Sequence, residues 1–398
     1  MDSIVLYTEE IDDTREAVAE LLVQTWEFPL KKHSLALIFA EEETDFPKLC
    51  SILAEHWDFP VVGCTAMGML GQKGYYGIGI FILLMTADDC FFAADMAKEL
   101  EQGNYKVKIA QTYNALAATL PSPPKLILSY GGMFPAEQRV SGDDVVDAIS
   151  EASGKNIPIF GGLAADGFNF NGYRIFCNGE TVQTGQLMIL IAGAIEPKFV
   201  TINSVENRSD FSYEVAKSSH NQVARLGNGT FLDALKHEDM AVDKTDVLGD
   251  YLLSPFVLTI NRENGDSVEV ARNLAVLDQE TGAGTFLGAV PEGSIMGVGI
   301  ISRTDVQKSV RQAFDVIFDE VAASKGKYTT MLCHSCCARF LALASDTREE
   351  TDAYSGRLPD DMAFLGMYAY GEYCPVKGNK TGENYNLFHN FTFSIMVI

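Results

Sequence analysis

The apolar residues of this chain occur in short runs, none of which reaches the length of a membrane-spanning helix. The run at residues 78–85 suits one buried strand, whereas a membrane span needs about 18 uninterrupted apolar residues. Because 47% of the residues are hydrophobic, such runs can still build a sizeable core. The pattern predicts a folded protein of many short elements, with no membrane insertion.

Strand-like and helix-like patterns alternate in the first 153 residues. Strands are expected at residues 4–7, 35–40, 61–64, 75–85 and 126–130. Helices are expected at residues 14–26, 46–55, 106–120 and 143–153. This stretch predicts one layered unit of sheet and helix.

The pattern changes from residue 157. Four short strands, joined by tight turns such as Asn178-Gly179, predict an antiparallel meander over residues 157–195. A second unit is expected after Glu196-Pro197, with an amphipathic helix at residues 306–323 and a polar, mobile linker at residues 345–361. The expectation is an α+β fold of two units, residues 1–197 and 198–398, each a mostly antiparallel mixed sheet with helices packed on its outer faces.

Charge and cysteine usage restrict the partners and the compartment. The 30 Lys and Arg against 54 Asp and Glu give a net charge of −24, which repels nucleic acid and anionic membrane surfaces. The first residues lack the basic and apolar regions of a signal peptide. Eight cysteines in so long a chain do not resemble a secreted disulfide framework. We therefore expect a cytoplasmic protein with reduced thiols.

One cysteine pair and one single cysteine are candidates for a redox, metal-binding or catalytic role. Cys333 and Cys336 form a C-x-x-C pattern where a strand runs into a helix, a position that can lower a thiol pKa. Zinc would need further ligands from distant segments, so burial of small side chains is the competing interpretation. Cys64 follows a short strand, where a nucleophile could stand, but nucleophilic catalysis needs an oriented base.

Polar residues interrupt apolar, strand-like segments near the carboxyl end. Tyr370 and Glu372 lie in one such segment, and His389 and Asn390 lie in another. Buried polar groups must be paired with each other or with a ligand. If these residues converge with Arg339, they offer a guanidinium for a carboxylate and a Glu acceptor for an ammonium group. A purely internal network is the equal alternative.

An ordered set of motifs along nearly the whole chain resembles the FIST domain family. The amino half contributes Val62-Gly63-Cys64-Thr65-Ala66, Phe160-Gly161-Gly162-Leu163-Ala164-Ala165-Asp166-Gly167 and Phe176-Cys177-Asn178-Gly179. The carboxyl half contributes Gly288-Ala289-Val290-Pro291-Glu292-Gly293-Ser294, Ser335-Cys336-Cys337-Ala338-Arg339, Gly366-Met367-Tyr368-Ala369-Tyr370-Gly371-Glu372 and His389-Asn390-Phe391-Thr392.

The resemblance implies paired FIST units that act as an intracellular sensory domain for a small metabolite, either amino-acid-like or another small carboxylate. Signalling would then pass through a separate output protein. The motifs place eight residues in the ligand site: Arg339, Tyr370, Glu372, His389, Asn390, Cys336, Cys64 and Asp166. No metal or catalytic residue is expected.

Three alternatives stay open at this point. A thiol-dependent enzyme would use Cys64 or Cys336 as its nucleophile. Some members of the family bind haem, so a gas sensor with His220 or His389 as axial ligand is the second alternative. The third is a scaffold whose acidic surface docks a basic partner.

Overall fold

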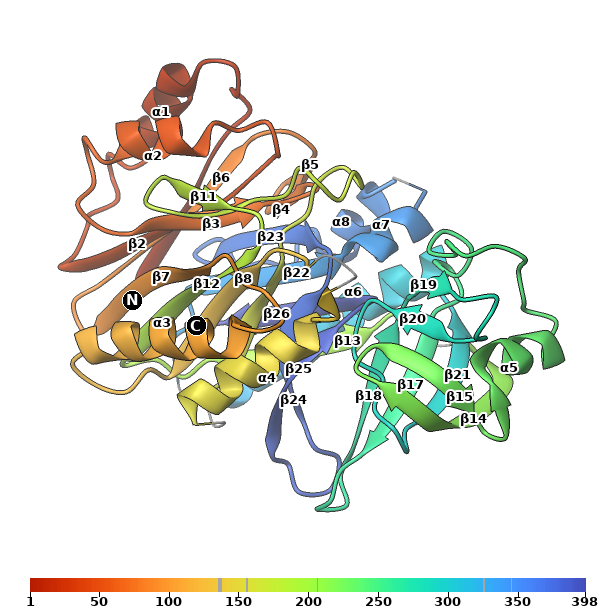
Figure 1. The fold of residues 1–398 in the computed structure, drawn as a ribbon. Helices are drawn as coiled ribbons and strands as arrows, with labels where there is room; N and C mark the ends of the chain where they lie inside the picture. The colour runs from red at the N-terminus through yellow and green to blue at the C-terminus, as the bar shows by residue number, and fades with distance from the viewer. Residues whose placement is uncertain (135–137, 155–156, 206, 325, 345) are drawn as a thin grey trace.

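The computed structural model describes residues 1–398 except 135–137, 155–156, 206, 325 and 345. Its described part combines mixed β-sheets with α-helices, which confirms the α+β class (Figure 1). The helices are α1 (Thr14–Val23), α2 (Phe46–Leu53), α3 (Tyr105–Thr119), α4 (Gly142–Ser153), α5 (Phe231–His237), α6 (Arg303–Ala323), α7 (Cys337–Ala342) and α8 (Arg348–Tyr354).

The first sheet shows why the amino-terminal apolar runs are nearly continuous. Its order is β1 (Asp2–Thr8), β6 (Ile80–Ala87), β2 (His33–Ala40), β3 (Val61–Thr65), β10 (Ile175–Cys177) and β11 (Glu180–Val182). Leu35, Leu37 and Phe39 of β2 face the main core, whereas Ala36 and Ile38 face the cluster beneath α1 and α2. A strand covered on both faces needs no polar alternation.

Two further sheets combine strands from both halves of the chain. The second sheet orders β25 (Asn384–His389), β24 (Glu372–Lys377), β9 (Ile159–Leu163), β8 (Leu126–Gly131), β12 (Gly185–Gly193) and β7 (Cys90–Lys98). The third orders β13 (Lys198–Asn203), β26 (Thr392–Val397), β22 (Thr330–Cys336), β23 (Ala363–Ala369), β4 (Met69–Gly71) and β5 (Gly74–Tyr76). Strands from both sides of the expected boundary at residues 197–198 therefore lie together in the same sheets.

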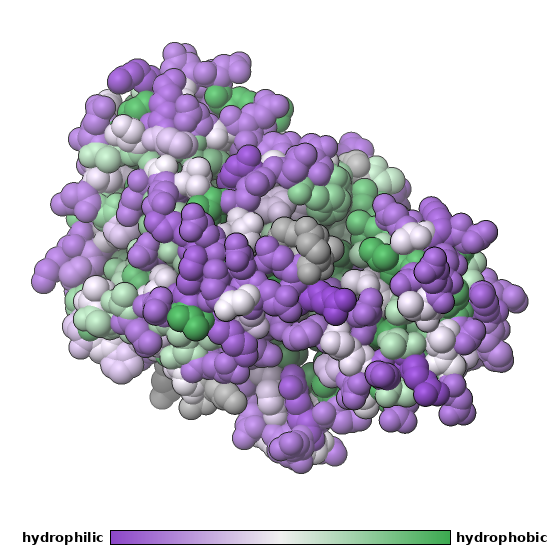
Figure 2. Space-filling view, in the orientation of Figure 1, coloured by the Kyte–Doolittle hydropathy of each residue, from purple (hydrophilic) through white to green (hydrophobic). Residues whose placement is uncertain are grey.

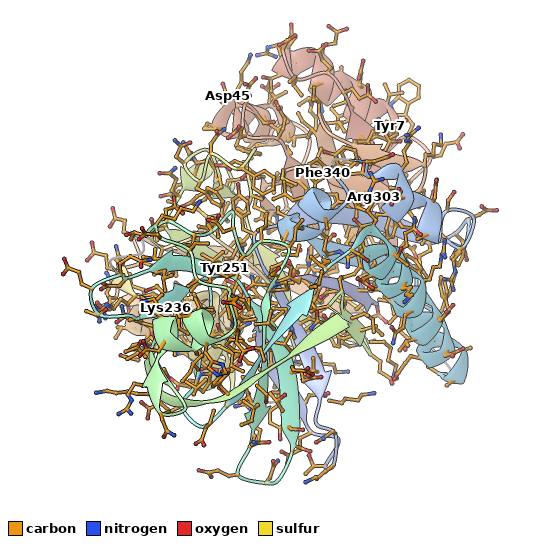
Figure 3. All side chains as sticks on the ribbon, turned by 90° about the vertical axis from the view of Figure 1, so that its right-hand side faces the viewer. Tyr7, Asp45, Lys236, Tyr251, Arg303 and Phe340 are labelled. Carbon is orange, nitrogen blue, oxygen red and sulfur yellow. The ribbon has the colours of Figure 1, made fainter. Side chains whose placement is uncertain are left out.

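The fourth sheet forms a separate body with its own apolar core. Its order is β18 (Ser267–Arg272), β17 (Phe256–Asn261), β21 (Ile295–Ile300), β14 (Asn207–Ser219), β15 (Gln222–Leu226), β20 (Gly284–Phe286) and β19 (Leu274–Leu277), with β16 (Gly229–Thr230) beside β15. The first part of the long β14 pairs with β21 and its last part with β15, and both ladders contain register shifts typical of β-bulges. Figure 3 shows this body toward the viewer, with Lys236 and Tyr251 on it and Tyr7 and Asp45 at the far end of the molecule.

Three expectations about local structure are corrected. The strands over residues 157–195 form no meander: β10 and β11 join the first sheet, whereas β9 and β12 join the second. Long-range pairing determined their places, since β9 lies parallel to β8 after the α4 crossover. The predicted linker at residues 345–361 contains α8, whose Glu350 and Tyr354 are buried. Strand β7 was not expected at all.

The face of the molecule drawn in Figure 2 is largely hydrophilic, with apolar residues in small, scattered groups. Among the described residues, no helix is both long and apolar enough to cross a membrane.

Candidate ligand-binding site

The polar residues of the carboxyl-terminal motifs lie where the chain passes between two sheets. Strand β23 of the third sheet ends at Ala369, and β24 of the second sheet begins at Glu372. The return passage runs from His389 in β25 to Thr392 in β26. Glu372 pairs with His389 across the β24–β25 ladder, so the two crossings are neighbours. The structure therefore brings Tyr370, Glu372, His389 and Asn390 into one region.

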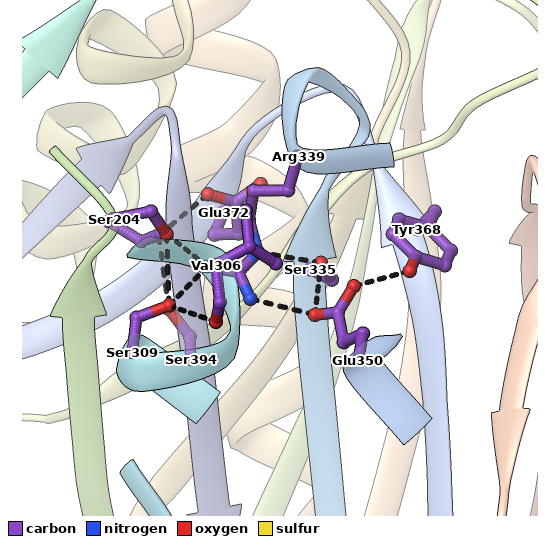
Figure 4. A network of polar contacts seen from close by, with 10 residues as sticks. Ser204, Val306, Ser309, Ser335, Arg339, Glu350, Tyr368, Glu372 and Ser394 are labelled. Atoms are coloured by element: carbon purple, nitrogen blue, oxygen red, sulfur yellow. Dashed lines mark hydrogen bonds and ion pairs between the residues drawn. The ribbon is translucent and has the colours of Figure 1, made fainter. Parts of the chain in front are cut away.

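Arg339 on α7 lies at the centre of a closed internal network. The side chain has no exposed surface. Its guanidinium donates to the hydroxyls of Ser335 at 3.0 Å, Ser309 at 2.8 Å and Ser204, and to a carboxylate oxygen of Glu350 at 2.8 Å (Figure 4). All three nitrogens of Arg339 are therefore engaged by protein oxygens.

The counter-ion of Arg339 comes from the segment that sequence reasoning treated as a linker. Glu350 accepts hydrogen bonds from Ser335 at 2.9 Å and from the Tyr368 hydroxyl. The guanidinium also lies 5.1 Å from the centre of the Phe393 ring. These contacts match the internal-network alternative, and a contact of Arg339 with a ligand stays a prediction.

Glu372 and Asn390 have unsatisfied polar atoms next to this network. Glu372 Oε2 accepts a hydrogen bond from Thr392 at 2.7 Å, but Oε1 has no partner. Burial raises the pKa of Glu372 to about 8, so the side chain is largely protonated at neutral pH. Asn390 Oδ1 is also buried without a partner. The region has hydrogen-bonding capacity that protein groups do not use.

His389 is buried and uncharged. Its Nε2 lies 3.0 Å from the carbonyl oxygen of Cys374, so that nitrogen carries the hydrogen and donates it. Burial lowers the pKa of His389 to about 4. The imidazole therefore orients β24 and does not supply a cation.

Asp166 organises the loop beside the first crossing. Its two carboxylate oxygens accept four backbone N–H groups from residues 169–172, at 2.7–3.1 Å. The Tyr370 hydroxyl donates to the same carboxylate and accepts the N–H of Phe168 at 3.0 Å. Burial opposes ionisation of Asp166, but these hydrogen bonds lower its pKa overall. Asp166 and Tyr370 thus fix the loop against the crossing.

The cysteines proposed as nucleophiles are inaccessible. Cys64 is fully buried, with its sulfur 3.8 Å from that of Met367, and Cys336 is 4% exposed. Burial raises the pKa of both thiols. All eight cysteines are buried and free. Nothing in the geometry favours the thiolate that nucleophilic catalysis requires.

A cavity of about 160 Å³ lies where the first crossing meets the fourth sheet. A cavity of about 150 Å³ can hold a molecule of the size of benzene. Tyr370 contributes to one wall, and is the one predicted site residue that does. The remaining lining is largely apolar and comes from Met133, Phe134, Val140, Val145, Leu163, Ala275, Val276, Phe286 and Leu287. The cavity thus lies between the amino-terminal sheets and the fourth sheet.

Two polar residues of this cavity were missed by sequence reasoning. Arg139 forms no hydrogen bond or ion pair with another described residue, and its backbone is left-handed at φ 50°. Asn221 donates to the Phe286 carbonyl at 2.8 Å, which leaves its buried Oδ1 without a partner. The capping box of Ser141 and Asp144 at the start of α4 was the available signal, because it places Arg139 just before a helix.

The two histidines proposed as haem ligands lie in different environments. His389 is buried and its Nε2 is engaged by Cys374. His220 lies at the surface, 3.5 Å from Asp144. Within the described residues there is also no group of three or more His, Cys, Asp or Glu side chains that could hold a metal ion.

The family of the chain follows from comparison with family models. The FIST N domain model matches residues 34–228, and the FIST C domain model matches residues 232–375. The chain therefore belongs to the FIST family and carries both domains in tandem, as the motifs predicted. FIST domains are sensory domains of signal transduction. A comparison with curated proteins finds no match.

Proposed function

We propose that this protein is a sensor that binds a small zwitterionic or anionic metabolite, such as an amino acid or another small carboxylate, in the cavity between the fourth sheet and the amino-terminal sheets. One observation carries the proposal. Arg139 and Asn221, two residues with polar groups that no described residue binds, line a small and largely apolar cavity.

The chemistry of the cavity defines the ligand class. A guanidinium without a counter-ion favours a carboxylate, and an unpartnered amide oxygen favours a donor such as an ammonium group. The apolar walls leave room for a short side chain. Because the two walls come from different bodies of the molecule, an occupant would contact both, and it can favour one arrangement of them over another.

The crossing residues have a supporting role in this proposal. Tyr370 reaches the cavity, while Asp166 holds the Tyr370 hydroxyl from the other side. Arg339, Glu372, His389 and Asn390 lie behind it and are absent from the cavity lining. They stabilise the chain segments that cross between the second and third sheets. Ligand binding in the cavity would be transmitted through these segments to a separate output protein. The eight free cysteines favour a reducing compartment such as the cytoplasm.

The test is a thermal-shift screen of the purified protein against the free amino acids and small dicarboxylates. A ligand that binds only the folded state at a hundredfold excess over Kd adds about 2.7 kcal/mol of stability. For a compound that shifts the melting temperature, we expect Arg139→Ala to weaken binding about tenfold in calorimetry, which equals about 1.4 kcal/mol.

The matched control is Arg225→Ala. Arg225 is an arginine of the fourth sheet that lies outside the cavity and donates to the Asn228 carbonyl at 3.0 Å. Its loss should leave affinity unchanged. If none of these compounds shifts the melting temperature, or if both variants bind equally well, the proposed site is wrong.

A further inference from the structure

A groove of about 890 Å³ lies outside the candidate ligand site. We call it the edge groove. Its lining includes residues 198–202 of β13, Val316 and Glu320 of α6, and residues 375–377 of β24. None of its lining residues belongs to the cavity beside Tyr370.

Strand β13 presents an open edge to this groove. It is the last strand of the third sheet and pairs with β26 alone among the described strands. The N–H of Ser204 donates to Phe391 at 3.0 Å, in the register of the β13–β26 ladder. In an antiparallel ladder the bonded residues alternate, so the backbone N–H and C=O groups of Phe199 and Thr201 point away from β26.

The opposite wall also contains unpaired backbone. Strand β9 pairs with β24 at Glu372 and Tyr373 only, so the described ladder of residues 374–377 is with β25 alone. Pro375 lies in this stretch and has no N–H to offer, as is usual for an edge position. The lining of the groove thus includes two strands that each have backbone without a described ladder partner on one side.

The charge of the edge groove differs from that of the whole chain. The chain has a net charge of −24, but the groove has three lysines and two glutamates. Lys198 pairs with Glu196 at 2.7 Å, and Lys377 pairs with Glu320 at 3.1 Å. Lys125 is exposed and forms no ion pair with a described residue. The groove therefore has one uncompensated positive charge within an acidic molecule.

We propose that the edge groove binds an extended, acidic segment of the output protein, which adds a strand to the open edge of β13. Backbone hydrogen bonds to Phe199 and Thr201 would provide affinity, and alternate apolar side chains would enter the groove. A carboxylate beside Lys125 would provide specificity. A strand of six residues spans about 20 Å, which matches the six residues of β13. This proposal rests on the proposed function in one respect, namely that the bound segment belongs to the output protein of a sensor.

The test uses a fluorescein-labelled peptide of six residues in which valine and glutamate alternate. Fluorescence anisotropy measures its affinity, and hydrogen exchange measures protection of the Phe199 and Thr201 amides. We expect binding with at least tenfold slower exchange at these two amides. A peptide with N-methylated backbone on one edge, and one with lysine in place of glutamate, should each bind at least tenfold more weakly.

Two variants provide the matched comparison. Thr201→Pro removes an edge N–H together with the side-chain hydrogen bond to Ser394 at 2.8 Å, whereas Thr201→Ala removes the side-chain bond alone. Only the proline variant should lose peptide binding. Because Thr201→Pro could also unfold the edge, the N-methylated peptide tests the same hydrogen bonds on the unaltered protein. Lys125→Glu should weaken binding about tenfold.

Several results would overturn the proposal. They are equal binding of the parent and N-methylated peptides, binding without protection of the β13 amides, or no binding. A dimer in sedimentation whose edge amides are already protected would assign the groove to a second copy of the chain instead. Metabolite binding to the other cavity is measured separately, so either proposal can fail alone.

Discussion

Two arginines of this chain have opposite environments. Arg339 belongs to a family motif, has no exposed surface and donates to four protein side chains. Arg139 belongs to no motif, is exposed, and borders a cavity without a described partner. A guanidinium that is already fully hydrogen-bonded cannot bind a ligand without losing those bonds. The motif arginine is therefore suited to hold the fold, and the other arginine is free to bind.

The largest effect should come from breaking the buried pair. Arg339→Ala leaves Glu350 buried and without its counter-ion, which typically costs about 3–5 kcal/mol. Urea unfolding would measure this loss. Arg348→Ala is the control, because Arg348 is 83% exposed in its pair with Asp346 and should change stability by about 0.5 kcal/mol or less. If Arg339→Ala leaves stability unchanged but abolishes metabolite binding, then Arg339 is the ligand-binding arginine and its assignment as a structural residue is wrong.

The second effect concerns Glu372, which lies beside the Arg339 network. Its folded pKa of about 8 exceeds the usual 4.5, so the unfolded chain ionises first as the pH rises. Its contribution to stability is complete below about pH 4.5 and is lost as the pH rises toward 8. Glu372→Gln should therefore be more stable than the parent protein above neutral pH, by about 2–4 kcal/mol at pH 8.

Unfolding curves from pH 5 to pH 9 test this sign. The difference between the Gln variant and the parent should grow with pH through this window and level off above pH 8. The depressed pKa values of His334 and His389 act below pH 6.5 and are common to both proteins, so they cancel in the difference. A constant difference would show that Glu372 is already ionised in the folded protein.

The sequence predicted the fold class better than it predicted which strands pair with one another. The α+β class and most elements followed from apolar periodicity, and the turn at Asn178-Gly179 does join β10 to β11. Periodicity describes one element at a time, so it could not show that β24 and β4 would join sheets of the other half. The segment that contains Glu350 was predicted to be a linker. One buried carboxylate among polar neighbours produces no apolar pattern from which a helix could be predicted.

The third effect separates binding from folding at Arg139. Arg139→Ala removes no described contact, so we expect the unfolding free energy to change by about 0.5 kcal/mol or less. The same variant should lose about tenfold in affinity for a metabolite that shifts the melting temperature. A large loss of stability instead would mean that Arg139 is structural, and the contrast with Arg339 would disappear.

The smallest effect should be the response of the thiols. Cys64 and Cys336 are buried and have raised pKa values, so the folded protein should react with iodoacetamide at neither residue over an hour at pH 7.5. Mass spectrometry after denaturation should find all eight cysteines labelled. Because Cys336 lies next to the Arg339 network, Arg339→Ala should expose it to labelling before Cys64. Rapid labelling of one native thiol would instead revive the thiol enzyme, since only a thiolate with access to solvent reacts in that way.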